Sequence, residues 1–247
     1  YFIIFSKTAN NFFTQYNKTK SHHLIKKKIP RFGSISIFFT LILNIIFLSD
    51  SPNLDISLLV IIAITPFFLI GILEDFTNNI SPYLRLLFSF FPGFYIFFFG
   101  YFLNNSGISF FDFFLNNFFI LIIVTVLYTA TLSHAFNIID GLNGLASGIG
   151  IIMFLGISII SYSENDYFIF NFSNIMIFIL LGFFVLNWPF GKIFLGDSGS
   201  YLIGSTIAII SLIFINRNPE YNLLLLLPLL SYPFIEISYI TIRRLIN

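Results

Sequence analysis

Residues 57–75 read SLLVIIAITPFFLIGILED, an apolar stretch that ends at the acidic pair Glu74 and Asp75. The hydrocarbon layer of a bilayer is about 30 Å thick, and a helix needs about 20 mostly apolar residues to cross it. A segment exposed to lipid must satisfy its own backbone polar groups, so it is expected to be helical. The stretch therefore predicts a membrane-spanning helix that carries two carboxylates at its end.

The rest of the chain repeats this pattern. Of its 247 residues, 57% are hydrophobic and only 9% are charged, against about 25% charged residues in soluble domains. We expect an all-α fold, a polytopic transmembrane helical bundle with about eight complete spans in one membrane-embedded domain over residues 1–247. The predicted spans are 33–48, 57–73, 84–102, 117–133, 145–160, 170–187, 200–215 and 222–242. Because the chain begins at Tyr1 and stops just after Arg243 and Arg244, we also expect it to be truncated at both ends.

Basic residues predict how the bundle is oriented. Lys and Arg are retained preferentially in cytosolic loops. When the basic loop of residues 7–31 is placed in the cytosol, only Arg217 falls on the outer side. The other basic residues after this loop then share the cytosolic side: Arg85, Lys192, Arg243 and Arg244. The chain is thus predicted to be a multi-pass membrane protein with these four residues on the cytosolic side.

Acidic residues divide into two groups under the same orientation. Those of the outer loops, including Asp112 and Asp166, are expected to be solvated. A second group is predicted to meet at the cytosolic surface: Glu74, Asp75, Asp140 and Asp197. Carboxylates that meet repel one another unless a cation is present, and oxygen ligands without any cysteine favour Mg²⁺, with Mn²⁺ as the other choice. Mg²⁺ usually shares its coordination with substrate phosphates, so the group indicates phosphoryl chemistry.

Three polar segments are candidates for the chemistry. In the first, residues 71–85, Ser81 and Pro82 predict the cap and first turn of a new helix. In the second, residues 133–148, Asn137, Asp140 and Asn143 lie among glycines, which permit close approach of a ligand. A solvated helix end and an Asx-capped turn are the alternative interpretations of these two segments.

The third polar segment, residues 187–200, contains Lys192, Gly196, Asp197 and Ser200 just before or within the start of a span. The free N–H groups at a helix N-terminus favour an anion, so a metal-bound phosphate suits this loop. A helix N-cap beside a lysine that extends to the interface is the alternative.

Taken together, these segments resemble the polyprenyl-phosphate N-acetylhexosamine-1-phosphate transferase family, a glycosyltransferase-4-like group. The resemblance covers essentially the whole chain and rests on the order and spacing of several short motifs. The matching motifs are Pro30-Arg31-Phe32-Gly33, Glu74-Asp75, Asn137-x-x-Asp140-Gly141-x-Asn143-Gly144, Gly196-Asp197-x-Gly199-Ser200 and Arg243-Arg244. The family usually has two aspartates where this chain has Glu74 and Asp75.

The resemblance implies a role for each matching residue. Asp197 is expected to bind the metal, and Glu74, Asp75 and Asp140 are expected to be catalytic. The expected substrate-binding residues are Asn137, Asn143, Lys192, Arg31, Gly196 and Ser200. The implied reaction moves a HexNAc-1-phosphate from a UDP-sugar to a polyprenyl (undecaprenyl) phosphate with release of UMP, and so starts a lipid-linked glycan such as O-antigen or a cell-wall precursor.

The expected partners are therefore a polyprenyl phosphate, a UDP-sugar and the bilayer, with no nucleic acid; a homodimer stays open. The alternative function is a transporter or flippase for an anionic or lipid-linked solute, since interrupted helices and intramembrane acids also occur in transporters. Transporters, however, place such residues near the bilayer midplane. Here only Glu236 is predicted to lie at that depth.

Overall fold

The computed structural model describes residues 30–47 and 54–246. Of the basic loop predicted at residues 7–31, residues 7–29 lie outside them. Within the described residues the fold is helical and contains no strand, as predicted. In chain order the helices are α3 (Gly33–Phe47), α4 (Leu54–Thr77), α5 (Pro82–Ser89), α6 (Phe91–Phe98), α7 (Ser109–Leu115), α8 (Phe118–Ile139), α9 (Leu145–Ser163), α10 (Tyr167–Asn187), α11 (Gly196–Arg217) and α12 (Leu223–Ile246).

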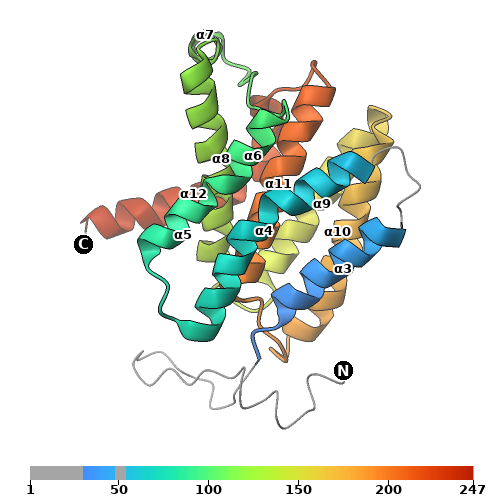
Figure 1. Cartoon of the computed structure of the whole chain (residues 1–247), viewed down its shortest axis with the longest axis vertical. Coiled ribbons are helices and arrows are strands. Elements are labelled where there is room, and N and C mark those ends of the chain that lie inside the picture. The colour runs from blue at the N-terminus through green and yellow to red at the C-terminus, as the bar shows by residue number, and fades with distance from the viewer. Residues whose placement is uncertain (1–29, 48–53, 247) are drawn as a thin grey trace.

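Helix α11 forms the centre of the bundle. It packs against α3, α4, α8 and α9, which surround it in Figure 1, and residues 198–215 along it are all buried. A helix shielded from lipid can carry hydroxyl groups if neighbouring helices satisfy them. Ser205 pairs with Ser133 of α8 at 2.8 Å, and Ser211 pairs with Tyr128 of α8 at 2.7 Å. Polar contacts therefore fix α8 against the central helix.

All eight predicted spans coincide with helices, but not all are complete spans. Among residues 30–47 and 54–246, six helices are long and apolar enough to cross a membrane: α4, α8, α9, α10, α11 and α12 as far as Ile240. Helix α3 is shorter, and the predicted span 84–102 is instead two short helices, α5 and α6, that meet at Phe90. Ser81 caps α5 as predicted, since its hydroxyl accepts from the N–H of Leu84 at 3.3 Å.

The loop after α6 differs from the prediction. It contains a helix that the sequence did not predict, α7. Its acid Asp112 is not simply solvated, because one carboxylate oxygen accepts from both the N–H and the hydroxyl of Ser106, at 2.7 and 2.6 Å.

Asp166, which was also expected to be solvated, is buried. Its carboxylate accepts from the N–H of Ile169 at 3.3 Å and from Nε of Arg217 at 2.8 Å. Arg217, the one basic residue predicted on the outer side, is therefore neutralised by an ion pair. The two acids hold the loops at this end of the bundle.

Candidate active site

The acidic pair at the end of α4 meets the first turn of α11. Asp75 is buried, and its Oδ1 accepts from the N–H of Asp197 at 2.8 Å. Its Oδ2 accepts from the N–H and the hydroxyl of Ser198, at 3.1 and 2.5 Å. The first N–H groups of a helix lack partners within it, so Asp75 caps α11 from another helix. The sequence-based expectation that these N–H groups are free for a ligand is wrong for Asp197 and Ser198.

Two glycines make this close approach of α4 and α11 achievable. A Cβ on Gly71 would lie 2.5 Å from Cα of Ser198. Gly196 has a φ of +78°, which glycine adopts without the steric cost that other residues incur. A Cβ there would lie 2.5 Å from a carboxylate oxygen of Asp75. The backbone of α11 therefore starts directly against the carboxylate that caps it.

A guanidinium group supplies the positive charge that the acidic residues need. Nη1 of Arg85, on α5, lies 3.0 Å from Oδ2 of Asp197 and 3.7 Å from Oε1 of Glu74. The other oxygen of Glu74 accepts from the N–H of Ile80 at 2.9 Å. Sequence reasoning used Arg85 only to orient the bundle. Arg85 lies in the first turn of the helix that follows the acidic pair, and this position could have indicated that it pairs with the acids.

A second guanidinium approaches from the segment before α3. Nη1 of Arg31 lies 3.9 Å from Oδ1 of Asp75. The backbone also holds this segment to the α10–α11 loop, because the N–H of Phe194 donates to the carbonyl of Pro30 at 3.0 Å and that of Gly33 donates to Phe194 at 3.1 Å. The Pro30–Gly33 motif is thus part of the site.

A pocket of about 300 Å³ opens at this end of the bundle. Six of the predicted site residues line it: Arg31, Asn137, Asp140, Asn143, Gly196 and Asp197. They come from the segment before α3, the end of α8 with its following loop, and the start of α11. The pocket therefore combines three of the motifs that the sequence separated by many residues.

The remaining predicted residues lie beside the pocket or away from it. Glu74 and Asp75 lie next to the pocket. Arg85 contacts both Glu74 and the pocket residue Asp197, and Asp75 accepts from the N–H of Asp197. Ser200 adjoins the pocket through Asn137, whose Nδ2 donates to the Ser200 hydroxyl at 3.1 Å. Lys192 is exposed and does not line the pocket; its Nζ lies 5.5 Å from the centroid of the Phe190 ring.

Asn187 is a pocket residue that sequence reasoning did not select. Its Oδ1 accepts from the N–H of Gly144, and its Nδ2 donates to the carbonyl of Ile193 at 2.7 Å. The side chain thus ties the loop after α8 to the loop before α11, and it also lines the pocket. A buried amide at the end of an apolar span was the signal available in the sequence.

The surroundings of Asp140 disfavour its ionised form. It follows the last residue of α8, where a negative charge also faces the negative end of the helix dipole. Burial, reinforced by the charges of Asp197 and Asp75, raises the pKa of Asp140 to about 8, although Arg31 opposes the shift. A carboxyl with a pKa near neutrality can both take up and release a proton at neutral pH.

The donor atoms fit a hard divalent cation only if a substrate completes its coordination. Across the described residues, no three His, Asp or Glu side chains form a metal-binding group. Asp197 lines the pocket, and one of its oxygens is engaged by Arg85. Mg²⁺ commonly binds through one or two carboxylates, with waters and phosphate oxygens as its other ligands. The pocket suits that arrangement and does not provide an all-protein cage.

Known proteins are similar to most of this chain. Residues 57–215 match the family described as glycosyl transferase family 4. The chain is 33% identical over 221 residues to a phospho-N-acetylmuramoyl-pentapeptide-transferase of Staphylococcus haemolyticus. The aligned stretch covers 83% of this chain and 67% of that relative. It is 29% identical over 243 residues to an undecaprenyl-phosphate alpha-N-acetylglucosaminyl 1-phosphate transferase of Thermotoga maritima, covering 98% of the chain and 69% of the relative.

A third relative is matched over a shorter stretch. It is a probable undecaprenyl-phosphate N-acetylglucosaminyl 1-phosphate transferase of Bacillus subtilis, 33% identical over 125 residues. The match covers 50% of the chain and only 35% of that relative.

Proposed function

Because the chain belongs to glycosyl transferase family 4, we propose that it transfers a HexNAc-1-phosphate from a UDP-sugar to a polyprenyl phosphate such as undecaprenyl phosphate and releases UMP. The observation that carries the proposal is the single pocket in which Arg31, Asp140 and Asp197 meet. Relatives named for undecaprenyl-phosphate sugar-phosphate transfer support it. The product would start a lipid-linked glycan such as O-antigen or a cell-wall precursor.

The reaction would be a displacement at the sugar-linked phosphorus. An oxygen of the polyprenyl phosphate forms a new bond to that phosphorus, and the bond to the UMP oxygen breaks. The proton of the acceptor phosphate passes to the ionised form of Asp140, which is a stronger base than an ordinary carboxylate because its pKa is about 8. Glu74 and Asp75, which the resemblance also implies to be catalytic, do not take this proton in the proposed reaction. Asp75 is already bonded to the start of α11.

The other residues of the pocket would hold the two phosphate-containing substrates. Arg31 would pair with phosphate oxygens, because a guanidinium binds them through two parallel hydrogen bonds. The amides of Asn137 and Asn143 would contact the nucleotide-sugar. Asp197 would hold the metal, and a bound Mg²⁺ or Mn²⁺ would neutralise charge on the diphosphate.

The distribution of charge supports a cytosolic site in a bacterial inner membrane. Arg31, Arg85 and Lys192 all lie in or beside segments that form the pocket end of the bundle. At the opposite end Arg217 is paired with Asp166. Because basic residues are retained in the cytosol, the pocket end would face the cytosol, where nucleotide-sugars are made available.

The test is an assay of the purified protein with Mg²⁺, undecaprenyl phosphate and one UDP-sugar at a time. UDP-GlcNAc, UDP-GalNAc and UDP-MurNAc-pentapeptide would be compared, with UMP and the lipid-linked product identified by mass spectrometry. We expect equal amounts of UMP and lipid product with a UDP-HexNAc. Movement of a lipid-linked solute across the vesicle membrane, without release of UMP, would instead support the flippase alternative.

The metal assignment has a separate readout that does not depend on turnover. Mn²⁺ binding, followed by electron paramagnetic resonance in the presence of a UDP-sugar, should be lost in Asp197→Asn. It should be retained in Glu220→Gln, which removes an exposed carboxylate from the α11–α12 loop at the other end of the bundle. Equal Mn²⁺ binding by the two variants would remove Asp197 from the metal site.

A further inference from the structure

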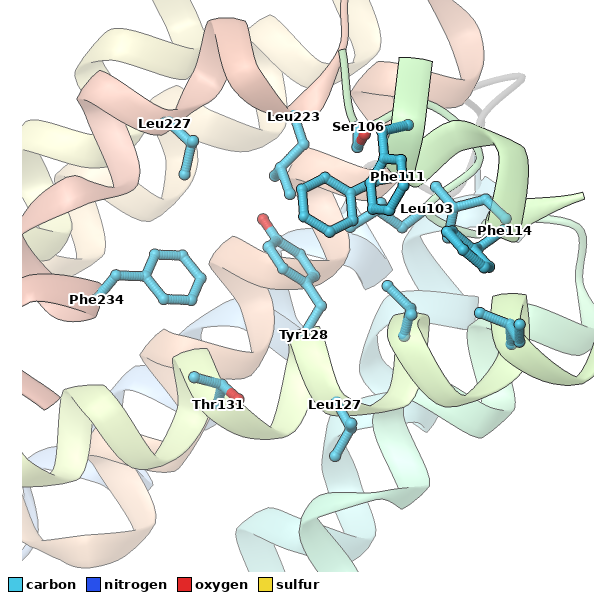
Figure 2. Close-up of a pocket in the computed structure, with 14 residues that line it drawn as sticks. Leu103, Ser106, Phe111, Phe114, Leu127, Tyr128, Thr131, Leu223, Leu227 and Phe234 are labelled. Atoms are coloured by element: carbon cyan, nitrogen blue, oxygen red, sulfur yellow. The ribbon is translucent and has the colours of Figure 1, made fainter. Parts of the chain in front are cut away.

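A second, larger cavity lies toward the opposite end of the bundle. Its volume is about 570 Å³, it is open on one side, and it is lined by α7, α8, α12 and the loop that follows α6. Figure 2 shows Leu227 and Phe234 of α12 on one side of the space and Tyr128 of α8 on the other, with Phe111 of α7 toward one end. This cavity shares no residue with the pocket of about 300 Å³ that contains Asp140 and Asp197, which we call the carboxylate pocket.

The wall of this cavity is almost entirely hydrocarbon. No residue that lines it carries a charge. The Tyr128 hydroxyl is already paired with Ser211 at 2.7 Å, and the Ser106 hydroxyl donates to Asp112 at 2.6 Å. The Thr131 hydroxyl is the one other polar side-chain group in the lining, so a polar ligand would lose most of its bonds to water without gaining replacements here. The chemistry of the wall therefore selects an apolar chain.

The length of the cavity matches one leaflet of a bilayer. On α8 its lining runs from Ile120 to Thr131, and on α12 from Leu223 to Phe234. At about 1.5 Å of rise per residue each stretch is about 16 Å long, close to half of the roughly 30 Å hydrocarbon layer. Both α8 and α12 are candidate membrane spans, so the surface between them is bathed by lipid. The cavity begins at the ends of these spans that lie away from Asp140.

Helix α7 lies beside the cavity with an apolar outer surface. Phe110, Phe113 and Phe114 are exposed, Phe113 by 73%. The single acid of the helix, Asp112, is bonded to Ser106 rather than free. A short helix that exposes phenylalanines and no free charge suits the boundary between headgroups and acyl chains. It would therefore lie in the same leaflet as the cavity.

From these observations we propose that the cavity holds one acyl chain of a phospholipid from the leaflet opposite the carboxylate pocket, with α7 lying in that leaflet at the cavity mouth. The bound chain fills a space that would otherwise lack contacts with its lining atoms. It thereby links α12 to α8 independently of the reaction at the other end. The proposal does not depend on the proposed function, because it involves none of the pocket residues.

Tryptophan fluorescence can test the proposal. The chain has one tryptophan, Trp188, so Trp188→Phe provides a background without fluorescence from the native site. Phe234→Trp places a probe in the cavity wall, and Phe178→Trp places a matched control on α10, where the side chain is 72% exposed. Both proteins would be reconstituted in vesicles of phosphatidylcholine with brominated acyl chains, which quench tryptophan on contact. They would then be diluted into plain detergent micelles.

The two probes should respond differently to dilution. The control at position 178 is expected to recover its fluorescence at once, because free lipid exchanges away. The probe at position 234 is expected to keep most of its quenching, because the chain in the cavity leaves slowly. Recovery of both probes at the same rate would overturn the proposal. Recovery at position 234 only on addition of undecaprenyl phosphate would assign the cavity to the polyprenyl chain and also overturn it.

A filling substitution provides an independent check. Val124→Phe, in the Phe234→Trp protein, adds a ring from the α8 wall and should release the retained quenching. Leu227→Phe does the same from the α12 wall if the first variant fails to fold. Quenching that persists in a folded filled variant would show that the brominated chain contacts position 234 from outside the cavity, contrary to the proposal.

Discussion

Nη1 of Arg85 lies 3.0 Å from Oδ2 of Asp197, although 112 residues separate the two in the chain. The same nitrogen lies 3.7 Å from Oε1 of Glu74. One guanidinium therefore bridges the end of α4 and the start of α11 at the place where the carboxylates gather. Its charge allows these acids to lie together before any metal or substrate is bound.

Replacing Arg85 should destabilise the protein through Asp197. Both side chains are partly exposed, 22% and 28%, so solvent screening limits the coupling to about 1 kcal/mol. Thermal unfolding in detergent of Arg85→Gln, Asp197→Asn and the double variant would measure that coupling. We expect the double variant to be more stable than the sum of the two single losses predicts. Strictly additive losses would mean that the ion pair contributes nothing to stability.

The fold could be predicted largely from apolar runs, because lipid permits few structures other than helices. The break at Phe90 and helix α7 could not. Residues 84–102 are apolar on both sides of Phe90, so hydropathy does not show that the helix restarts there. Helix α7 is a short phenylalanine-rich segment between two asparagine-containing turns, and composition alone cannot distinguish it from a loop.

Six residues of the carboxylate pocket were predicted from the sequence, but Asn187 and the contacts that the acids make were not. Motif order placed Arg31, Asp140 and Asp197 together, as the structure does. That Asp75 bonds to N–H groups of α11 depends on how two helices dock, which no local pattern encodes. Lys192 lies outside the pocket lining, with its Nζ 5.5 Å from the centroid of the Phe190 ring, and its role in substrate binding stays a prediction.

Asp75→Asn should mainly weaken the joint between α4 and α11. Its amide nitrogen cannot accept from the N–H or hydroxyl donors that face the carboxylate. The loss of a helix cap and of charge-assisted hydrogen bonds is expected to cost about 2 kcal/mol or more. Asp55→Asn is the matched control, since it removes an exposed carboxylate from the other end of the same helix. Equal melting temperatures for the two variants would contradict the capping role.

Stability should depend on pH through Asp140. Its pKa is raised from the ordinary value of 3.8 to about 8, so the folded protein holds this proton more tightly than the unfolded chain does. The protonated Asp140 therefore adds to the free energy of unfolding at low pH, and this contribution is lost as pH rises from about 4 to about 8. With EDTA present, the melting temperature of Asp140→Asn relative to the parent should rise over this range. A difference that does not change with pH would show that folding does not raise the pKa of Asp140.

The close approach of α4 and α11 predicts opposite effects for two glycine-to-alanine changes. Gly182, within α10, has nothing within 4 Å of an added Cβ, whereas a Cβ on Gly71, within α4, would lie 2.5 Å from Cα and 2.8 Å from N of Ser198. Alanine favours a helix over glycine by about 0.5–1 kcal/mol, so Gly182→Ala should be neutral or stabilising.

Gly71→Ala gains the same propensity but must push α11 away, and overpacking costs about 1–3 kcal/mol or more when backbone atoms cannot move aside. The displacement would also pull Ser198 from Asp75. Gly71→Ala should therefore lower both the melting temperature and UMP release, while Gly182→Ala keeps both. If the two variants behave alike, the helices do not touch at Gly71, and the carboxylate pocket cannot depend on that contact.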